Sequence, residues 1–252
     1  MSEIARLRSR LHAQFAAFFV AIVGVTLLLT HEKPHPGAVD LPALPKHDLA
    51  ARKEAFFSFL MPIVVHHNDR IRDERAFLFS LKEREGPGFW QRRRFKALAE
   101  RYEVDVDELG YADALVLLKR RVDVIPPSLV LIQAAKESGW GRSRFAREGN
   151  ALFGEWCFSE GCGMVPARRA KGRRHEVRSF DNVHDAVASY MDNINSHRSY
   201  RDLRIARAEM RDDGEKLSGL RLAEHLMRYS ERGAPYVEEI RRMIINNGLE
   251  SG

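Results

Sequence analysis

A single carboxylate stands out by its place in the sequence. Glu137 closes the apolar and alanine-rich run "LVLIQAAKES" (129–138). If a helix begins at Pro127, Glu137 lies in its last turn, where unpaired carbonyls form the negative end of the helix dipole. Trp140 follows three residues later and would keep water away from the carboxyl group. Both effects raise a carboxyl pKa, as a general acid for glycosidic cleavage requires. The alternative is a surface glutamate in a frayed last turn.

The cysteines form a second group with possible chemistry. Cys157 and Cys162 are the only two in the chain, and they lie close together in "CFSEGC". In an oxidising compartment such a pair can close a small loop as a disulfide. Metal binding is the competing interpretation, but no histidine lies nearby at ligand spacing. We therefore expect a disulfide and no metal site.

Helical periodicity dominates the chain from residue 48 onward. Apolar residues recur at spacings of three and four over 50–85, which predicts an amphipathic pair of helices. "GPG" at 86–88 ends this stretch. Further helices are expected over 89–104, over 105–122, and from Pro127 to a stop at Gly139.

The pattern changes over 151–180, which is rich in glycine, arginine and short apolar runs. "RRHEVRSF" (173–180) approaches the alternation of a strand, so we expect a small β-hairpin with Lys171 and Gly172 near its turn. Helices resume after Asp181, which can act as a cap. The sequence therefore predicts a mainly α fold with a small β insertion.

The first thirty residues differ from the rest. Three arginines among the first ten residues precede an uncharged run over 15–30, near the lower length limit for a spanning helix. The positive-inside rule keeps the arginines in the cytoplasm and sends the rest across the membrane. No clear small-x-small site follows, so we expect residues 1–30 to be an uncleaved, single-pass inner-membrane anchor; cleavage and secretion is the alternative. The proline-rich segment 31–47 predicts an extended tether.

Composition limits the class of partner. The 252 residues include 41 Lys and Arg against 35 Asp and Glu, which gives a net charge of +6. Such a balance suits anionic partners such as cell-wall polymer, a membrane surface or nucleic acid. The basic residues are scattered and no nucleic-acid-binding motif is present, so we expect no nucleic-acid partner. The sequence does not identify a protein partner.

The stretch "AAKESGWGRSRFAREGNALFGEW" (134–156) resembles the signature of the peptidoglycan β-N-acetylglucosaminidase family, the mannosyl-glycoprotein endo-beta-N-acetylglucosaminidase-like proteins, and in particular its bacterial Bax-type members. This resemblance implies a lysozyme-like helical lobe, a small β lobe and a groove between them. It places Glu137 at the position of the general acid and implies no cofactor. The resulting division of the chain is a signal anchor (1–30), a tether (31–47), a helical extension (48–125) and a glucosaminidase-like catalytic domain (126–248).

Other family positions carry over residue by residue. Asn150, Phe153 and Gly154 match the family's N-L-F-G motif, with Ala151 inserted after the asparagine, and would shape the floor of the groove. Tyr229 matches a tyrosine near the scissile bond, so the resemblance implies a catalytic role in which it positions water or the acetamido group. Tyr236 matches a second tyrosine in the following helix and is expected to bind substrate. The two tryptophans of this region could stack on sugar rings or act as buried wedges; these are Trp140 and Trp156.

A second carboxylate is where the sequence departs from the family. Some members carry a glutamate in the β hairpin about forty residues after the acid. Glu176 is the acid found in "ARRAKGRRHEV", but its register matches poorly, and Glu155 and Glu160 lie nearer. Each could instead pair with local arginines. If none reaches the anomeric carbon, the 2-acetamido oxygen of the substrate could attack it.

Together with the expected anchor, the resemblance implies a periplasmic hydrolase on the inner membrane that cuts the glycan strands of peptidoglycan at N-acetylglucosamine. A lytic transglycosylase is one alternative, although its G-L-M-Q type segment is absent and "NALFGEW" stands there. A non-catalytic wall-binding scaffold also fits the basic charge and the tether. Retention of Glu137 among flanking glycines favours the enzyme.

Overall fold

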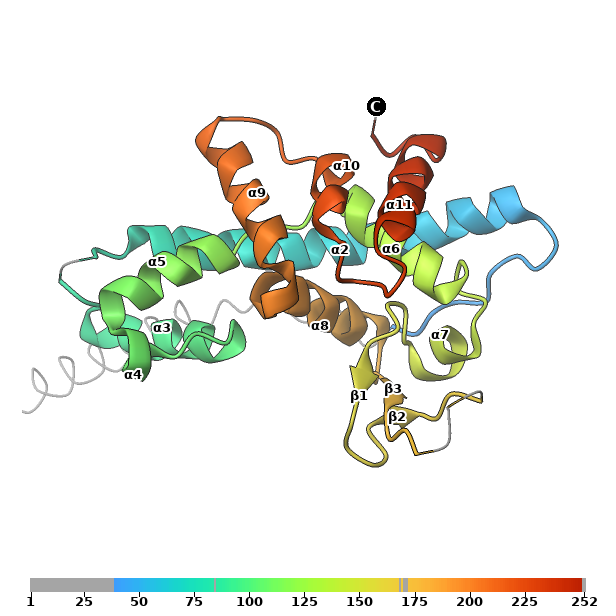
Figure 1. Cartoon of the computed structure of the whole chain (residues 1–252), viewed down its shortest axis with the longest axis horizontal. Helices are drawn as coiled ribbons and strands as arrows, with labels where there is room; N and C mark the ends of the chain where they lie inside the picture. Colours follow the sequence, from blue (N-terminus) through green and yellow to red (C-terminus); the bar gives the residue numbers. More distant parts are fainter. Residues whose placement is uncertain (1–38, 84, 168, 170–171, 251–252) are drawn as a thin grey trace, which may run out of the picture. The chain divides into compact units, whose positions relative to one another are not determined.

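The computed structural model describes residues 39–83, 85–167, 169 and 172–250, which fold mainly into helices with a small sheet (Figure 1). The expected membrane helix over 15–30, the first part of the tether and Lys171 lie outside these residues. No helix within the described ranges is long and apolar enough to cross a membrane. The elements are α2 (Leu49–Ser80), α3 (Phe89–Arg101), α4 (Val106–Leu109), α5 (Tyr111–Arg121), α6 (Pro127–Ser138), α7 (Arg144–Gly149), β1 (Trp156–Cys157), β2 (Gly163–Met164), β3 (Glu176–Arg178), α8 (Val183–Ser196), η1 (Arg198–Tyr200), α9 (Arg201–Asp212), α10 (Gly219–Leu222), η2 (Ala223–His225) and α11 (Ala234–Asn246).

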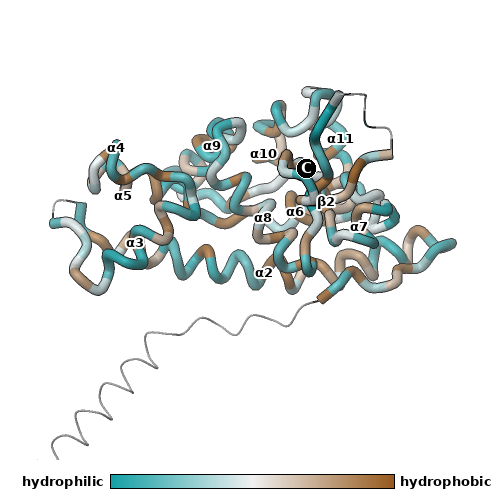
Figure 2. Tube along the Cα trace, turned by 90° about the horizontal axis from the view of Figure 1, so that it is seen from below, coloured by the Kyte–Doolittle hydropathy of each residue, from teal (hydrophilic) through white to brown (hydrophobic). Residues whose placement is uncertain are grey.

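The first helix corrects the expectation of a helical pair over 50–85. The structure has one 32-residue helix, α2, whose N-cap Asp48 accepts a hydrogen bond from the amide of Ala51. Pro62 lies inside the helix and removes one backbone donor. Buried side chains continue on both sides of it, from Phe56 to Leu78, so packing on a common core keeps the helix continuous. Figure 2 shows hydrophobic and hydrophilic residues alternating along α2.

Helix α6 lies at the centre of the core. Its residues 128–135 are all buried, and α2, α10 and α11 pack against it. Pro127 stands at the start of the helix, and Gly139 ends it in the left-handed conformation with φ of +61°, as the sequence predicts. Buried side chains from 56–125 and from 129–244 belong to the same hydrophobic cluster.

The β lobe is a three-stranded antiparallel sheet rather than the simple hairpin expected from the sequence. The strand order is β1-β3-β2, with Trp156 opposite Val177 and Gly163 opposite Arg178. The sequence pattern identified β3 but not the two-residue strands β1 and β2, because alternation is not visible over so few positions. The sheet lies next to α7 and the start of α8 (Figure 1).

The described end of the expected tether packs against the core. Leu41 and Leu44 contact the hydrophobic cluster, and their side chains approach Gly141. Val39 accepts a backbone hydrogen bond from Val183. Residues 39–47 are thus part of the folded body of the protein, since their leucines bury apolar surface that a free tether would leave in water.

Candidate active site

Glu137 lies in the last turn of α6, and its half-buried side chain lines a large groove. The groove has a volume of about 1260 Å³. A Cβ atom built on Gly154 would lie 3.9 Å from Oε2 of Glu137, so the absence of a side chain there leaves that oxygen accessible. Gly154 has a φ of +66°, a conformation that favours glycine.

A chain of hydrogen bonds holds the other oxygen of Glu137. The hydroxyl of Tyr236 donates to Oε1 at 2.9 Å, and Nε2 of Gln133 donates to the Tyr236 oxygen at 3.1 Å. The Tyr190 hydroxyl in turn donates to Oε1 of Gln133. Because the amide occupies Tyr236 as an acceptor, the tyrosine proton is directed at the carboxylate. Tyr236 is 2% exposed, so it holds the Glu137 carboxyl group from the core side and is too buried to contact sugars.

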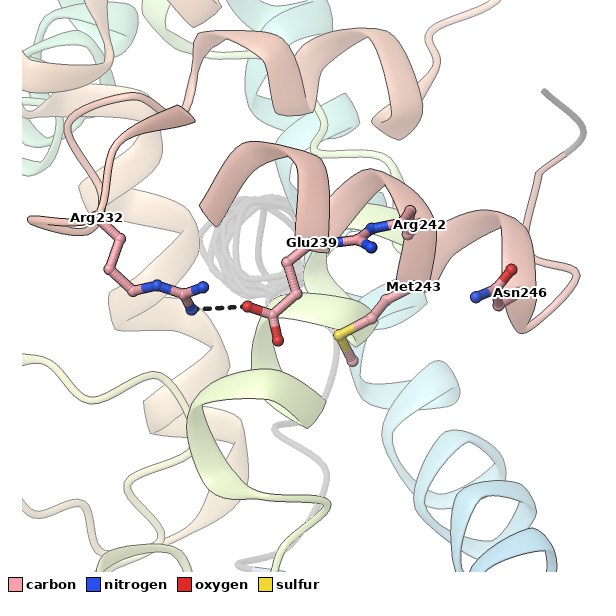
Figure 3. Close-up of a pocket in the computed structure, with 5 residues that line it drawn as sticks. All are labelled: Arg232, Glu239, Arg242, Met243 and Asn246. Atoms are coloured by element: carbon pink, nitrogen blue, oxygen red, sulfur yellow. Dashed lines mark hydrogen bonds and ion pairs between the residues drawn. The ribbon is translucent and has the colours of Figure 1, made fainter. Parts of the chain in front are cut away.

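The pKa of Glu137 is raised, mainly because burial disfavours its charged form. The hydrogen bond from Tyr236 and the charge of Lys136 oppose this rise, and the charge of Glu239 adds to it. Glu239 on α11 forms ion pairs with Lys136 and Arg232. Figure 3 shows Glu239 directed toward Arg232 at a smaller pocket of about 430 Å³. The negative charge of Glu239 thus offsets the positive charge of Lys136, which would otherwise favour the ionised form of Glu137.

Tyr229 and Phe153 line the groove beside Glu137. The Tyr229 ring stacks on Tyr236 with centroids 5.5 Å apart, and its hydroxyl donates to the Phe153 carbonyl at 3.1 Å. Phe153 stacks on Tyr190 at 4.0 Å. These contacts fix the Phe153–Gly154 segment opposite the carboxyl group, as expected of a groove floor.

Of the two roles that the sequence left open for Trp140, the structure favours the wedge over stacking on sugars. Trp140 does not line the groove; its indole packs edge-on against Phe56 and Phe57 of α2, at 6.1 and 5.3 Å. Lys53 lies over the ring at 4.9 Å. The cause is the backbone, which has positive φ at Gly139, Trp140 and Gly141 and so turns this segment onto α2. Trp140 is thus a partly buried wedge against the hydrophobic core.

Asn150 also has a structural place and does not line the groove. It ends α7 in the left-handed conformation, with φ of +52°. Its amide nitrogen donates to Asp40 and to the Phe180 carbonyl, and its oxygen accepts from the amide of Leu41. Asparagine tolerates this conformation well. Through its hydrogen bonds, Asn150 joins the segment at residue 40 to the end of the β lobe.

Among the three candidate second carboxylates, the groove is lined only by Glu155. Burial raises its pKa to about 6, although a 2.8 Å hydrogen bond from Ser189 and the charge of Arg178 lower it. Its Oε1 is buried and has no hydrogen-bond partner in the described part of the chain. Burial raises the pKa of Tyr200 to about 12, and the charges of Glu155 and Glu137 add to that rise. Glu137, Glu155 and Tyr200 all line the groove.

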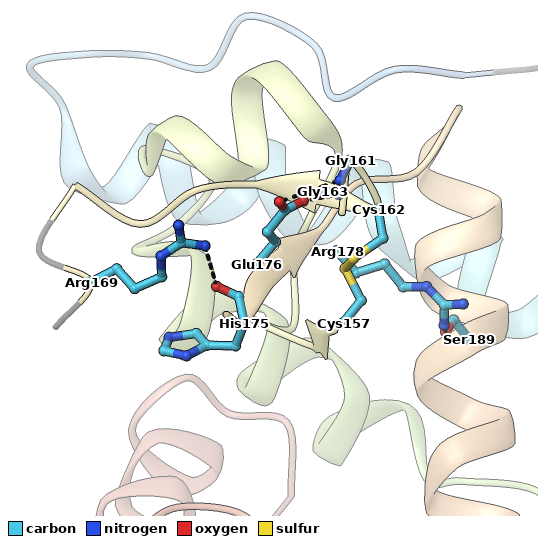
Figure 4. Close-up of a disulfide and its surroundings, with 9 residues drawn as sticks. All are labelled: Cys157, Gly161, Cys162, Gly163, Arg169, His175, Glu176, Arg178 and Ser189. Carbon is cyan, nitrogen blue, oxygen red and sulfur yellow. Dashed lines mark hydrogen bonds between the residues drawn. A yellow bond between two sulfur atoms is a disulfide. The ribbon is translucent and has the colours of Figure 1, made fainter. Parts of the chain in front are cut away.

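The other two candidates lie elsewhere. Glu160 is exposed and away from the groove. Glu176 is 7% exposed, and its two oxygens accept from the amides of Gly161 and Gly163, at 3.3 and 2.9 Å (Figure 4). Glu176 thus holds the loop before β2, and its bonds are structural.

Cys157 and Cys162 form a disulfide in this lobe (Figure 4). The five-residue separation encloses Phe158, which is 72% exposed and lines the groove together with Trp156. Trp156 is 58% exposed and stacks on His175 at 4.4 Å. Two exposed aromatic rings at the groove, one enclosed by the disulfide and one stacked on a histidine, can bind the apolar faces of sugars.

Several residues of the site were missed at the sequence level, among them Tyr190 and Ser189 of α8 as well as Gln133 and Phe158. Gln133 supports Tyr236, and its signal was a lone amide in an otherwise apolar helix, four residues before Glu137. Phe158 had a weaker signal, a large aromatic residue between two cysteines in a glycine-rich stretch.

Comparison with known proteins agrees with this arrangement. The family model described as mannosyl-glycoprotein endo-beta-N-acetylglucosaminidase matches residues 112–249. The chain is 34% identical to Protein bax of Escherichia coli (strain K12) over 200 residues, which covers 78% of this chain and 70% of the relative. No solved structure matches the chain at a significant level. The matched range contains Glu137, the groove floor and the β lobe.

Proposed function

Since the chain belongs to the mannosyl-glycoprotein endo-beta-N-acetylglucosaminidase family, we propose that it hydrolyses the glycan strands of peptidoglycan at N-acetylglucosamine linkages. Membership supports a glycosidase-type enzyme. The observation that carries the finer proposal is Glu137, which has one oxygen bonded to Tyr236 and the other open to the groove beside Gly154. This is the arrangement that a positioned general acid needs.

In the proposed step, protonated Glu137 gives its proton to the glycosidic oxygen. The bond between that oxygen and the anomeric carbon of N-acetylglucosamine breaks as the proton arrives. The raised pKa of Glu137 favours the protonated form that a general acid requires. Tyr236 holds the carboxyl group in one orientation, so that Oε2 faces the substrate.

Glu155 is the proposed base. With a pKa of about 6 it is mostly ionised at neutral pH, yet basic enough to take a proton from water. The water oxygen then bonds to the anomeric carbon, one water is consumed, and the products are a reducing N-acetylglucosamine end and a free hydroxyl on the next sugar. If Glu155 is not the base, the 2-acetamido oxygen of the substrate is the nucleophile.

The shape of the groove supports a polymeric substrate. It runs from Trp156 and Phe158 of the β lobe along α8 to Arg101 at the end of α3. A volume of about 1260 Å³ exceeds the roughly 300–1,000 Å³ of a site for a single small molecule. The two exposed aromatic rings would hold sugars by stacking, and the polar residues of α8 would bind their hydroxyl groups.

We also propose a periplasmic location with residues 15–30 as a single inner-membrane span. The uncharged run after three arginines supports this orientation, and the disulfide suits an oxidising compartment. A reporter fused after residue 252 that is active only outside the cytoplasm should report activity. A cytoplasmic signal would contradict both the location and a cell-wall substrate.

The products test the proposed reaction. The full chain should release fragments with reducing N-acetylglucosamine ends from purified cell wall, as identified by mass spectrometry. Anhydro-muramic ends would instead identify a lytic transglycosylase. Binding without release of any fragment would identify a non-catalytic scaffold.

A further inference from the structure

A pair of aromatic residues at the start of α3 is exposed without a role in the groove. Phe89 is 77% exposed and Trp90 is 80% exposed, the highest values among the large apolar side chains of the described residues. Their centroids are 5.1 Å apart, and α3 lies far from the three strands in Figure 1. Adjacent large apolar side chains in water mark a surface that contacts a partner.

The local backbone holds this pair in place. Gly86, with φ of +72°, and Pro87 form the turn before the helix. The Gly88 amide then donates to the Gln91 side chain at 2.9 Å, which caps the first turn of α3. Phe89 and Trp90 are the first two residues of that helix, so a capped turn presents them to solvent.

Within the first eight residues of α3 the charged side chains are all positive. Residues 89–96 carry four cations and no acidic group. Arg94 is committed to the body of the protein, since it donates to the Asp73 carbonyl and lies over the Phe77 ring. The remaining three are exposed, and none forms an ion pair with another described residue; they are Arg92, Arg93 and Lys96.

Helical spacing places Arg93 and Lys96 on the same side of α3 as Phe89. The two aromatic rings meet at 83° and so form a wedge, with no common platform for successive sugars of a strand. A wedge of Phe and Trp flanked by arginines matches instead a bilayer interface, where aromatic rings enter the headgroup region and cations bind lipid phosphates. We propose that this aromatic-basic patch (Phe89, Trp90, Arg92, Arg93 and Lys96) docks on the surface of an anionic phospholipid bilayer.

The fluorescence of Trp90 tests the proposal in the full chain. The protein is mixed with vesicles of phosphatidylcholine, with or without phosphatidylglycerol, whose acyl chains carry bromine as a contact quencher. The chain has three tryptophans. Phosphatidylglycerol vesicles should quench wild-type emission, and Trp90→Phe should remove that quenching. Trp156→Phe, which changes an exposed tryptophan in the groove, is the matched control and should retain it.

The cations of the aromatic-basic patch provide a second test of the proposal. Each surface cation favours an anionic bilayer by about a fivefold factor, so Arg92→Gln and Arg93→Gln together should reduce the docked fraction strongly. Turnover of soluble glycan fragments should stay unchanged, because these residues lie outside the groove. Equal quenching of wild type and Trp90→Phe, or no effect of the arginine changes, would overturn the proposal. A change in Trp90 emission on addition of purified wall, with no quenching by the lipid vesicles, would assign the patch to glycan. That result would also overturn the proposal.

Discussion

Removal of the Tyr236 hydroxyl should move the proton equilibrium of Glu137 in a predictable direction. That hydroxyl donates to Oε1 at 2.9 Å and lowers the carboxyl pKa, because the bond favours the charged form. Tyr236→Phe keeps the ring and its stacking on Tyr229. Without the donor, Glu137 should keep its proton to higher pH.

The size of the shift follows from the strength of the lost bond. A hydrogen bond to a charged group contributes about 1.5–3 kcal/mol, and one pKa unit corresponds to about 1.36 kcal/mol. Because Glu137 is half-buried, water can replace part of the bond, so the lower end applies and the pKa should rise by about one unit. The Gln133 amide also loses its acceptor, which should cost about 1–3 kcal/mol of folding stability.

The assay is kcat/KM on solubilised glycan strands as a function of pH. The limb that reports loss of the Glu137 proton should move by about one unit to higher pH in Tyr236→Phe. Tyr229→Phe is the matched control, since its hydroxyl bonds the Phe153 carbonyl and not Glu137. It should reduce turnover by disturbing the groove floor, yet leave that limb in place. An unmoved limb in Tyr236→Phe would refute the assignment of Glu137 as the titrating acid.

Further predictions concern other titrating groups. Glu155→Gln should lower turnover by about a hundred-fold or more and remove a limb of the pH profile near 6; wild-type turnover would exclude Glu155 as the base. Glu239→Gln leaves Lys136 unpaired beside Glu137, so the Glu137 limb should move to lower pH without any change in the groove; a shift to higher pH would contradict this coupling. His67 is 3% exposed, and burial lowers its pKa from 6.5 to about 3. As the pH falls below 6.5, the unfolded chain therefore protonates this histidine before the folded chain does. The free energy of unfolding, measured by urea titration, should fall between pH 6.5 and pH 3 by up to about 1.4 kcal/mol per pH unit. His67→Gln should flatten this loss, and an equally steep loss in the variant would assign it to other groups.

The sequence predicted those features that depend on local chemistry. The bounds of α6 follow from Pro127 and Gly139, and the position of Glu137 in its last turn follows from those bounds. Prediction of the disulfide required only the close spacing of Cys157 and Cys162 and the expectation of an oxidising compartment.

Features that depend on long-range packing could not be predicted in the same way. Trp140 turns onto α2 because three successive residues adopt positive φ, a conformation that a tryptophan does not suggest. The choice of Glu155 over Glu176 depends on which side chain reaches the groove and which one accepts backbone amides. Glu155 lies in "LFGEWCF" and Glu176 in "RRHEVRS", and neither local pattern indicates which carboxylate faces the groove.

The most direct test of the account is Glu137→Gln in the full chain. The change keeps the size of the side chain and can still accept from Tyr236, but it cannot give a proton to a departing sugar oxygen. The account predicts that release of reducing N-acetylglucosamine ends from purified wall falls by about a hundred- to ten-thousand-fold, while helical content and binding to wall material stay at wild-type levels. Cleavage at the wild-type rate would contradict it and leave Glu137 as a structural residue at the end of α6.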